Sequence, residues 1–313
     1  MNVAFIDTVH PVLNQMLEAK GMACHDLHQH DIQSLKLIIK DFDGIVLRSR
    51  IPMNADFLQH ATRLKFIARS GSGLENIDLD YCTKNNIVCF NSPEGNRDAV
   101  GEHAVGMLLM LFDKLSKADA EVRQGIWLRE ENRGYEIAGK TVGIIGCGVM
   151  GNAFAKRLSG FECTVIGYDK YKRNYTNQYI HEVSLHELQE RADIISLHVP
   201  LTPETKYMVD AAFIDKTAKP FYLINTSRGP CVNTAHLVEA LKTGKIKGAC
   251  LDVLEYEKPS FEKLDIATLP QPMHYLAASD KVILSPHIAG WTFESYYKLS
   301  SYLGEKIIQH FGL

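Results

Sequence analysis

Glycines spaced to receive a dinucleotide follow an apolar run near the middle of the chain. The segment Lys140–Gly151 reads KTVGIIGCGVMG, and a helical pattern follows it. In such a GxGxxG loop between a strand and a helix, the first glycine permits a tight turn and the second lets the backbone approach a diphosphate. The third allows close packing of helix on strand. Gly146, Gly148 and Gly151 therefore predict a dinucleotide site at a helix N-terminus.

An acidic residue lies where such a site contacts the ribose of the dinucleotide. Asp169 follows the expected strand 164–168, about 20 residues beyond the glycines, where a carboxylate can accept from ribose hydroxyls and repel a 2′-phosphate. NAD is therefore expected in preference to NADP. Lys170, Lys172 and Arg173 come next, and they either hold that phosphate or form a solvated loop; Asp169 favours the second interpretation.

Three charged or titratable residues each follow an expected strand later in the chain. They are Arg228, Glu257 and His287. Ligands of open α/β sheets bind at the carboxyl ends of the strands, so these side chains are candidates for a common site. Taken singly, each has a structural alternative: a surface arginine, a loop acid and a capped core histidine.

The elements that must position these residues alternate between short β-branched runs and helical patterns. This alternation predicts an α/β fold with parallel sheets. The first third should form a small flavodoxin-like sheet from strands 3–6, 45–47, 65–68 and 87–90, with helices including 11–20 and 56–61.

The remainder of the chain has the strand count of a doubly wound Rossmann fold. Six strands are expected, at 141–145, 164–168, 194–197, 222–225, 249–252 and 282–284. A helix over 98–120 should lead into this domain, and a final helix over 294–311 should return to the first. We therefore expect an NAD-binding Rossmann domain at 98–292 and a substrate domain made of 1–97 plus 293–313.

Composition excludes several classes of function. The chain has 313 residues, of which 46% are hydrophobic and 23% charged, with a formal net charge of -3. Scattered cations give no face for nucleic acid. No apolar run approaches the ~18–20 residues that span a bilayer, so a cytoplasmic protein with no membrane partner is expected. Seven dispersed cysteines without a CxxC pair indicate neither a disulfide framework nor a metal site.

Taken together, these motifs resemble the D-isomer-specific 2-hydroxyacid dehydrogenase family over nearly the whole chain. The matching segments are Ser70–Asp78 (SGSGLENID), Asn91–Pro93 (NSP), the glycine loop, His198–Pro200 (HVP) with Thr205, Asn225–Gly229 (NTSRG), Leu251–Glu257 (LDVLEYE) and Ser285–Thr292 (SPHIAGWT). The resemblance implies an NAD-dependent enzyme, closest to phosphoglycerate dehydrogenases without a regulatory domain, since no further sequence follows Leu313.

The resemblance also implies a catalytic set. His287 would be the acid/base, Glu257 would orient and stabilise its imidazolium, and Arg228 would bind the substrate carboxylate. It further implies a cofactor set with Asp252 at the nicotinamide carboxamide: Ser72, Gly146, Gly148, Val149, Met150, Gly151, Asp169, Val199, Pro200, Thr205, Thr226, Ser227, Asp252, Ala289 and Gly290. The backbone N–H groups of Gly71, Ser72 and Gly73 should form a nest for the substrate carboxylate, and Ser70 should also contact the substrate.

Two arginines suggest a phosphorylated substrate. Arg48 and Arg69 stand at strand ends of the first domain, where they could pair with a phosphate. The expected pair is 3-phospho-D-glycerate and 3-phosphohydroxypyruvate, the substrates of serine biosynthesis. Alternatively, the arginines pair with Asp43 or Glu75, and the enzyme reduces glyoxylate, hydroxypyruvate or another 2-oxo acid. A rival from another class is an NAD(H)-sensing, corepressor-like binding protein.

The apolar segment 106–112 suggests self-association. Its apolar residues lie around more of the helix circumference than packing inside one domain would cover. This pattern predicts a homodimer formed across this helix. The alternative is a fully buried helix between the domains.

Overall fold

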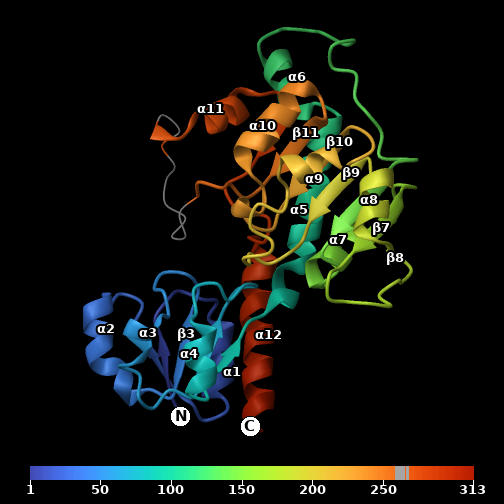
Figure 1. Ribbon diagram of the computed structural model, residues 1–313. Helices are drawn as coiled ribbons and strands as arrows, with labels where there is room; N and C mark the ends of the chain where they lie inside the picture. The colour runs from blue at the N-terminus through green and yellow to red at the C-terminus, as the bar shows by residue number, and fades with distance from the viewer. Residues whose placement is uncertain (258–264, 266–267) are drawn as a thin grey trace. The chain divides into compact units, whose positions relative to one another are not determined.

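The computed structural model describes residues 1–257, 265 and 268–313, and the chain separates into two compact units. Unit 1 comprises 1–96 and 291–313, and unit 2 comprises 97–290. Each unit contains a sheet with helices packed on it (Figure 1). Helix α5, Pro93–Phe112, contains the boundary between the units.

The described residues of unit 1 form a five-stranded parallel sheet in the order β2-β1-β3-β4-β5. Its strands are β1 (Asn2–Phe5), β2 (Ala23–Asp26), β3 (Gly44–Leu47), β4 (Phe66–Arg69) and β5 (Val88–Phe90). Its helices are α1 (Val12–Glu18), α2 (Ile32–Ile38), a 3-10 turn at Ile39–Asp41, α3 (Ala55–Leu58), α4 (Leu79–Lys84) and α12 (Phe293–Phe311).

Alternating side chains of these strands build two apolar layers. Val3 and Phe5 face a cluster that includes residues of α1 and α12, whereas Ala4 faces a second cluster that includes residues of α2 and α3. Helix α12 packs against α1, as the red and blue helices of Figure 1 show. The chain's last helix is therefore part of the core of unit 1.

Unit 2 has a seven-stranded parallel sheet within the described residues, in the order β12-β11-β10-β9-β6-β7-β8. Its strands are β6 (Thr141–Ile145), β7 (Thr164–Tyr168), β8 (His181–Glu182), β9 (Ile194–Leu197), β10 (Phe221–Asn225), β11 (Ile246–Leu251) and β12 (Val282–Leu284). Its further helices are α6 (Leu115–Arg123), α7 (Val149–Leu158), α8 (Leu185–Arg191), α9 (Ala211–Asp215), a 3-10 turn at Gly229–Cys231, α10 (Thr234–Thr243) and α11 (Gln271–Ala278).

The register of this sheet aligns the ends of its strands. Ile145 lies between Tyr168 and Leu197, and Asn225 lies between Leu197 and Leu251. The loops that leave β6, β7, β9, β10 and β11 therefore start side by side on one edge, where ligands of doubly wound folds bind.

The expected α/β class and paired parallel sheets are confirmed, but both sheets have one more strand than the sequence predicted. The additional strands, β2 and β8, lie at sheet edges. An edge strand contacts the core on fewer sides, so it needs no continuous apolar run. β2 reads ACHD and β8 has only two residues, which is why neither gave a strand pattern.

The prediction of a single helix over 98–120 was wrong, because two helices cover this segment. Helix α5 begins earlier, at Pro93, because proline suits the first helical position. It ends at Phe112, and Lys114 adopts a left-handed conformation with φ 53° before α6 starts. Among the described residues, no helix combines the length and apolar content that crossing a membrane requires.

Candidate functional site

The glycine loop leaves β6 and caps α7. Gly146 has φ +96°, and a Cβ there would lie 2.4 Å from the carbonyl oxygen of His198. A Cβ on Gly151 would lie 2.2 Å from the carbonyl oxygen of Gly146. Gly148 is the N-cap residue of α7 and a Cβ there would meet no atom within 4 Å. The loop thus presents bare backbone before Val149 and Met150, an arrangement that suits a diphosphate.

Asp169 lies beside this loop, at the end of β7. Its Oδ2 accepts the backbone N–H of Cys147 at 3.0 Å, and its Oδ1 accepts those of Tyr171 and Lys172, each at 3.0 Å. Burial opposes ionisation of this carboxyl, but the three backbone donors outweigh it, so the pKa of Asp169 is lowered. The negative charge expected next to the adenosine ribose is therefore held in place by the main chain.

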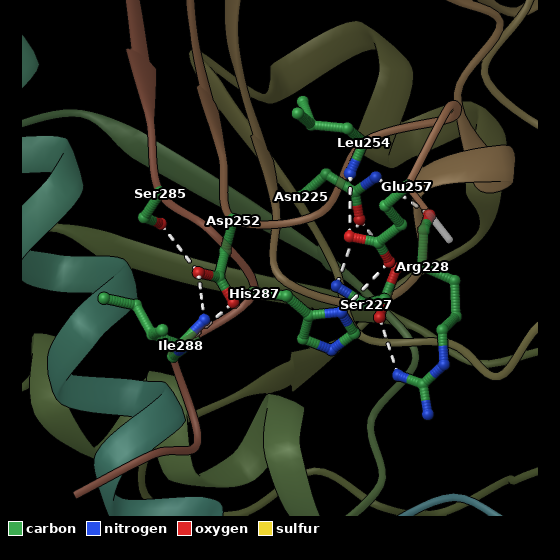
Figure 2. A network of polar contacts seen from close by, with 10 residues as sticks. Asn225, Ser227, Arg228, Asp252, Leu254, Glu257, Ser285, His287 and Ile288 are labelled. Atoms are coloured by element: carbon green, nitrogen blue, oxygen red, sulfur yellow. Dashed lines mark hydrogen bonds and ion pairs between the residues drawn. The ribbon is translucent and has the colours of Figure 1, made fainter. Parts of the chain in front are cut away.

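Glu257 and His287 meet at the carboxyl edge of the same sheet (Figure 2). His287 Nδ1 lies 3.0 Å from Glu257 Oε1, and both side chains are largely enclosed, with 27% and 22% exposed. Glu257 Oε2 also accepts the backbone N–H of Leu254 at 3.4 Å. A carboxylate on one ring nitrogen fixes the orientation of the imidazole and leaves the other nitrogen to face a substrate.

Arg228 joins this cluster from the loop after β10 (Figure 2). The Asn225 side-chain amide donates to the Arg228 carbonyl at 3.0 Å, while Asn225 Oδ1 accepts both the backbone N–H and the hydroxyl of Ser227. Arg228 Nη1 donates to the Ser227 carbonyl at 2.7 Å. The strand-end asparagine thereby fixes the backbone that positions the guanidinium.

Asp252 organises the turn on which His287 stands. This carboxylate is 1% exposed; its Oδ1 accepts the Ser285 hydroxyl at 2.6 Å and the Ile288 N–H at 2.8 Å, and its Oδ2 accepts the Ala289 N–H at 2.9 Å. His287 itself has φ +56°, uncommon for a non-glycine residue. The Asp252 carboxylate therefore binds the turn 285–289 within the chain. Its contact with the nicotinamide carboxamide, which the resemblance implies, stays a prediction.

Two histidines of unit 2 were given no role from the sequence, although His198 lies in the matching segment His198–Pro200. His103 Nε2, on α5, lies 2.9 Å from the Ser285 hydroxyl and 3.5 Å from Asp252 Oδ1. His198 Nε2 lies 2.8 Å from the Ser196 hydroxyl, and burial lowers the pKa of His198 to about 4. Neither has a diagnostic spacing in the sequence, since both contacts depend on how the strands align.

The remaining predicted cofactor residues of unit 2 lie on loops of the same edge, whereas Ser72 belongs to unit 1. The buried Thr226 hydroxyl has no partner among the described residues. The Thr205 hydroxyl donates to the Pro200 carbonyl at 2.6 Å, which tightens the turn after Val199. Ala289 is buried beside Gly290. An orphaned hydroxyl among these loops is consistent with a bound polar ligand.

In unit 1, the loop Ser70–Gly73 differs in part from the predicted nest. The Gly71 N–H donates to the Arg69 carbonyl at 2.9 Å, so this donor is committed within the chain. The N–H groups of Ser72 and Gly73 have no acceptor within the described part of the chain. Two of the three expected donors, those of Ser72 and Gly73, therefore face no competing bond.

The two predicted phosphate-binding arginines have different surroundings. Arg69 donates from Nε to the Arg48 carbonyl at 2.9 Å, bonds the Gly73 carbonyl and lies 3.7 Å from Glu75. The alternative pairing with Glu75 is thus the one present. The Arg48 guanidinium lies 4.1 Å from the ring centroid of Trp291, and burial lowers its pKa.

A family model described as "D-isomer specific 2-hydroxyacid dehydrogenase, NAD binding domain" matches residues 105–289. A D-3-phosphoglycerate dehydrogenase of Archaeoglobus fulgidus is 35% identical over 272 residues, covering 86% of this chain and 50% of that protein. A glyoxylate reductase of Thermofilum pendens is 34% identical over 307 residues, covering 95% and 87%. The chain thus spans about half the length of the first relative and most of the second.

Solved structures show the same fold. A D-lactate dehydrogenase from Aquifex aeolicus, solved with NAD and lactic acid, aligns with a TM-score of 0.82 at 29% identity. The alignment covers 99% of this chain and 95% of that one.

Proposed function

This chain belongs to the D-isomer-specific 2-hydroxyacid dehydrogenase family, and we propose that it interconverts a D-2-hydroxy acid and its 2-oxo acid with NAD as cofactor. The observation that supports this most directly is the 3.0 Å contact between His287 Nδ1 and Glu257 Oε1, in one cluster with Arg228. An acid/base and a carboxylate-binding cation are the two groups that this chemistry requires of the protein.

His287 would supply the proton. In reduction of a 2-oxo acid the imidazolium donates a proton to the carbonyl oxygen, and in the reverse direction the neutral ring removes it. Glu257 holds the ring through Nδ1, which directs the opposite nitrogen to the substrate and offsets the positive charge. Arg228 would bind the substrate carboxylate through paired N–H donors and place carbon 2 beside the histidine.

Residues of unit 2 fit an NAD molecule. The bare glycine loop and the N-terminus of α7 would hold the diphosphate, Asp169 the adenosine ribose, and Thr226 a polar group of the cofactor. When bound, reduced NAD supplies the hydride for carbon 2. The buried Asp252 would act behind this site, by holding the turn 285–289.

We propose 3-phosphohydroxypyruvate and 3-phospho-D-glycerate as the preferred substrate pair, with Arg48 as the phosphate ligand. Within the described residues the Arg48 guanidinium donates no hydrogen bond, and it stacks on the Trp291 ring. The Asp7 carboxylate interacts with this guanidinium through its charge. The N–H donors of Arg48 would pair strongly with a dianionic group. The donors of Ser72 and Gly73 would bind the carboxylate of the same substrate.

A second substrate class, unphosphorylated glyoxylate or hydroxypyruvate, is favoured by the contacts of Arg69. Its guanidinium already meets two carbonyls and the Glu75 carboxylate, so it holds the loop after β4 in place. A site with one arginine binds a phosphate group less strongly than a site with two, so it discriminates less against unphosphorylated substrates.

The substrate test is NADH oxidation with a panel of 2-oxo acids, comparing wild type with Arg48→Gln and Arg69→Ala. If Arg48 binds phosphate, Arg48→Gln should lower the specificity constant for phosphohydroxypyruvate roughly tenfold more than that for hydroxypyruvate. Arg69→Ala should impair both alike, because it loosens the loop. Arg63→Gln, which removes an exposed arginine paired with Asp43, is the matched control. Equal constants for the two substrates in wild type would instead support the unphosphorylated class.

We also propose that the chain forms a homodimer through the apolar surface after α5. Met107, Leu108 and Phe112 are buried within unit 2, so α5 itself offers little of that surface. Exposed apolar side chains instead gather on α6 and the segment after it, where Trp127 is 76% exposed; the others are Leu115, Val122, Ile126 and Leu128. Light scattering at micromolar concentration should give a dimer mass that Trp127→Lys reduces to a monomer mass. A monomer mass for wild type would contradict the proposal.

A further inference from the structure

A carboxylate from one loop of the cofactor edge holds two side chains from another. Glu204, in the loop after β9, lies 2.8 Å from the ammonium of Lys170 and accepts the hydroxyl of Tyr171. Lys170 and Tyr171 belong to the loop after β7, directly beyond Asp169. This interaction, the Glu204 bridge, lies entirely within unit 2.

The register of the sheet places this bridge beside the glycine loop. β6 lies between β7 and β9, and its last residue, Ile145, pairs with Tyr168 on one side and with Leu197 on the other. The Glu204 bridge therefore joins the two loops that flank the start of the GxGxxG segment. Asp169, the residue expected to read the ribose, is the immediate neighbour of Lys170 on that loop.

The cations of this loop are held in two different ways. Arg173 donates to the carbonyls of Asp169 at 3.0 Å and Lys172 at 2.7 Å, and Lys172 Nζ donates to the Cys147 carbonyl at 3.3 Å. The acceptors of these bonds are main-chain carbonyl oxygens, so substituting a neighbouring side chain does not remove them. Lys170 is instead held by a side-chain carboxylate, and its charge is offset there. Hydrogen bonds from Lys170 and Tyr171 in turn lower the pKa of Glu204, so the bridge is ionised at neutral pH.

We propose that Glu204 is a specificity-determining residue for NAD over NADP, because it holds Lys170 and offsets the charge that a 2′-phosphate would need. This inference rests on the proposed NAD-dependent function and adds a second carboxylate to Asp169. A 2′-phosphate carries close to two negative charges and binds tightly only where cations are available to pair with it. With the Glu204 bridge in place, the charge of Lys170 is offset by a carboxylate. The other two cations of the loop, Lys172 and Arg173, donate to main-chain carbonyls.

Glu204→Gln tests this directly, because an amide keeps the acceptor for Tyr171 and removes only the charge. The measurement is calorimetric binding of NADH and of NADPH, which needs no turnover. The affinity for NADPH should rise roughly tenfold in Glu204→Gln, and the affinity for NADH should change little. Glu239→Gln is the matched control, since it removes the same charge from an exposed pair with Lys242 on α10 and should leave both affinities unchanged.

A second variant tests whether Lys170 is responsible for the higher affinity for NADPH. In Lys170→Met the affinity for NADPH should be no better than in wild type, and adding Glu204→Gln to Lys170→Met should produce no gain. An unchanged ratio of NADPH to NADH affinity in Glu204→Gln would overturn the proposal, as would a gain that persists without Lys170. If wild type bound neither nucleotide, the proposed function itself would fail. If wild type bound NADH but Glu204→Gln left the ratio of NADPH to NADH affinity unchanged, only this inference would be rejected.

Discussion

The backbone N–H of His287 donates to the carbonyl of Asp252 at 2.8 Å, and the Asp252 carboxylate receives the N–H groups of the two residues that follow His287. One buried aspartate thus holds the main chain on which the candidate acid/base stands. The left-handed conformation of His287 persists because these bonds over-determine it.

Asp252→Asn should therefore damage both stability and catalysis. The amide places an N–H2 group against a backbone donor where Oδ2 now accepts, so we expect a loss of about 2–3 kcal/mol in the free energy of unfolding. The rate should also fall because the turn no longer fixes His287. Urea unfolding and NADH oxidation measure the two effects. Ser285→Ala removes one donor to Asp252 and the contact with His103, and should cost about 1 kcal/mol. Equal losses in both variants would contradict the central position given to Asp252.

His287→Asn should remove most of the turnover and leave cofactor affinity nearly unchanged. Asparagine tolerates the left-handed conformation, so the turn should survive the substitution. The rate should fall by roughly 10²–10⁴-fold, the usual contribution of a positioned acid/base. Stopped-flow rates with NADH titrations separate chemistry from binding. Near-normal turnover in a folded His287→Asn protein would show that another group transfers the proton.

Glu257→Gln should lower turnover less than His287→Asn does. The amide can still contact His287 Nδ1 and keep the ring in place, but it lacks the negative charge that offsets the positive charge on the ring during proton transfer. The rate of NADH oxidation with a 2-oxo acid should therefore fall by less than the roughly 10²–10⁴-fold expected for loss of the acid/base itself. Steady-state rates of the two variants, measured side by side, check this. A rate in Glu257→Gln as low as that of His287→Asn would contradict the milder effect.

His198 should make the protein less stable in acid. Burial lowers its pKa to about 4 from an ordinary value of 6.5, so between these values the unfolded chain binds a proton that the folded protein does not. Stability is therefore lost as pH falls through this window, by about 2 kcal/mol at pH 5, and His198 contributes no pH dependence above pH 7. Urea unfolding of His198→Gln should lack this component. His186→Gln, at a histidine 81% exposed, should retain it, and loss of the component in both would reject the assignment.

The structural features that the sequence predicted and the structure confirms are those with a local cause. Gly146 and Gly151 were identifiable because a tight turn and a close helix each exclude a side chain. The contact between Glu257 and His287, by contrast, was expected only because of the resemblance, since the residues are 30 positions apart.

Contacts formed by the fold as a whole were not predictable. The donors that satisfy Asp252 come from residues 33 to 37 positions later, and His103 on helix α5 reaches Ser285, which follows strand β12. Arg69 looked available for a phosphate because its bonds to main-chain carbonyls leave no trace in the sequence. β2 lacked an apolar run because it lies at an edge of its sheet.

The most direct test of the proposed activity is steady-state oxidation of NADH by the purified protein in the presence of 2-oxo acids, with the configuration of the product determined. We predict NADH consumption that depends on the 2-oxo acid and yields the D-2-hydroxy acid in equal amount. NADH binding without turnover on any 2-oxo acid would contradict it, and would favour a cofactor-sensing binding protein instead.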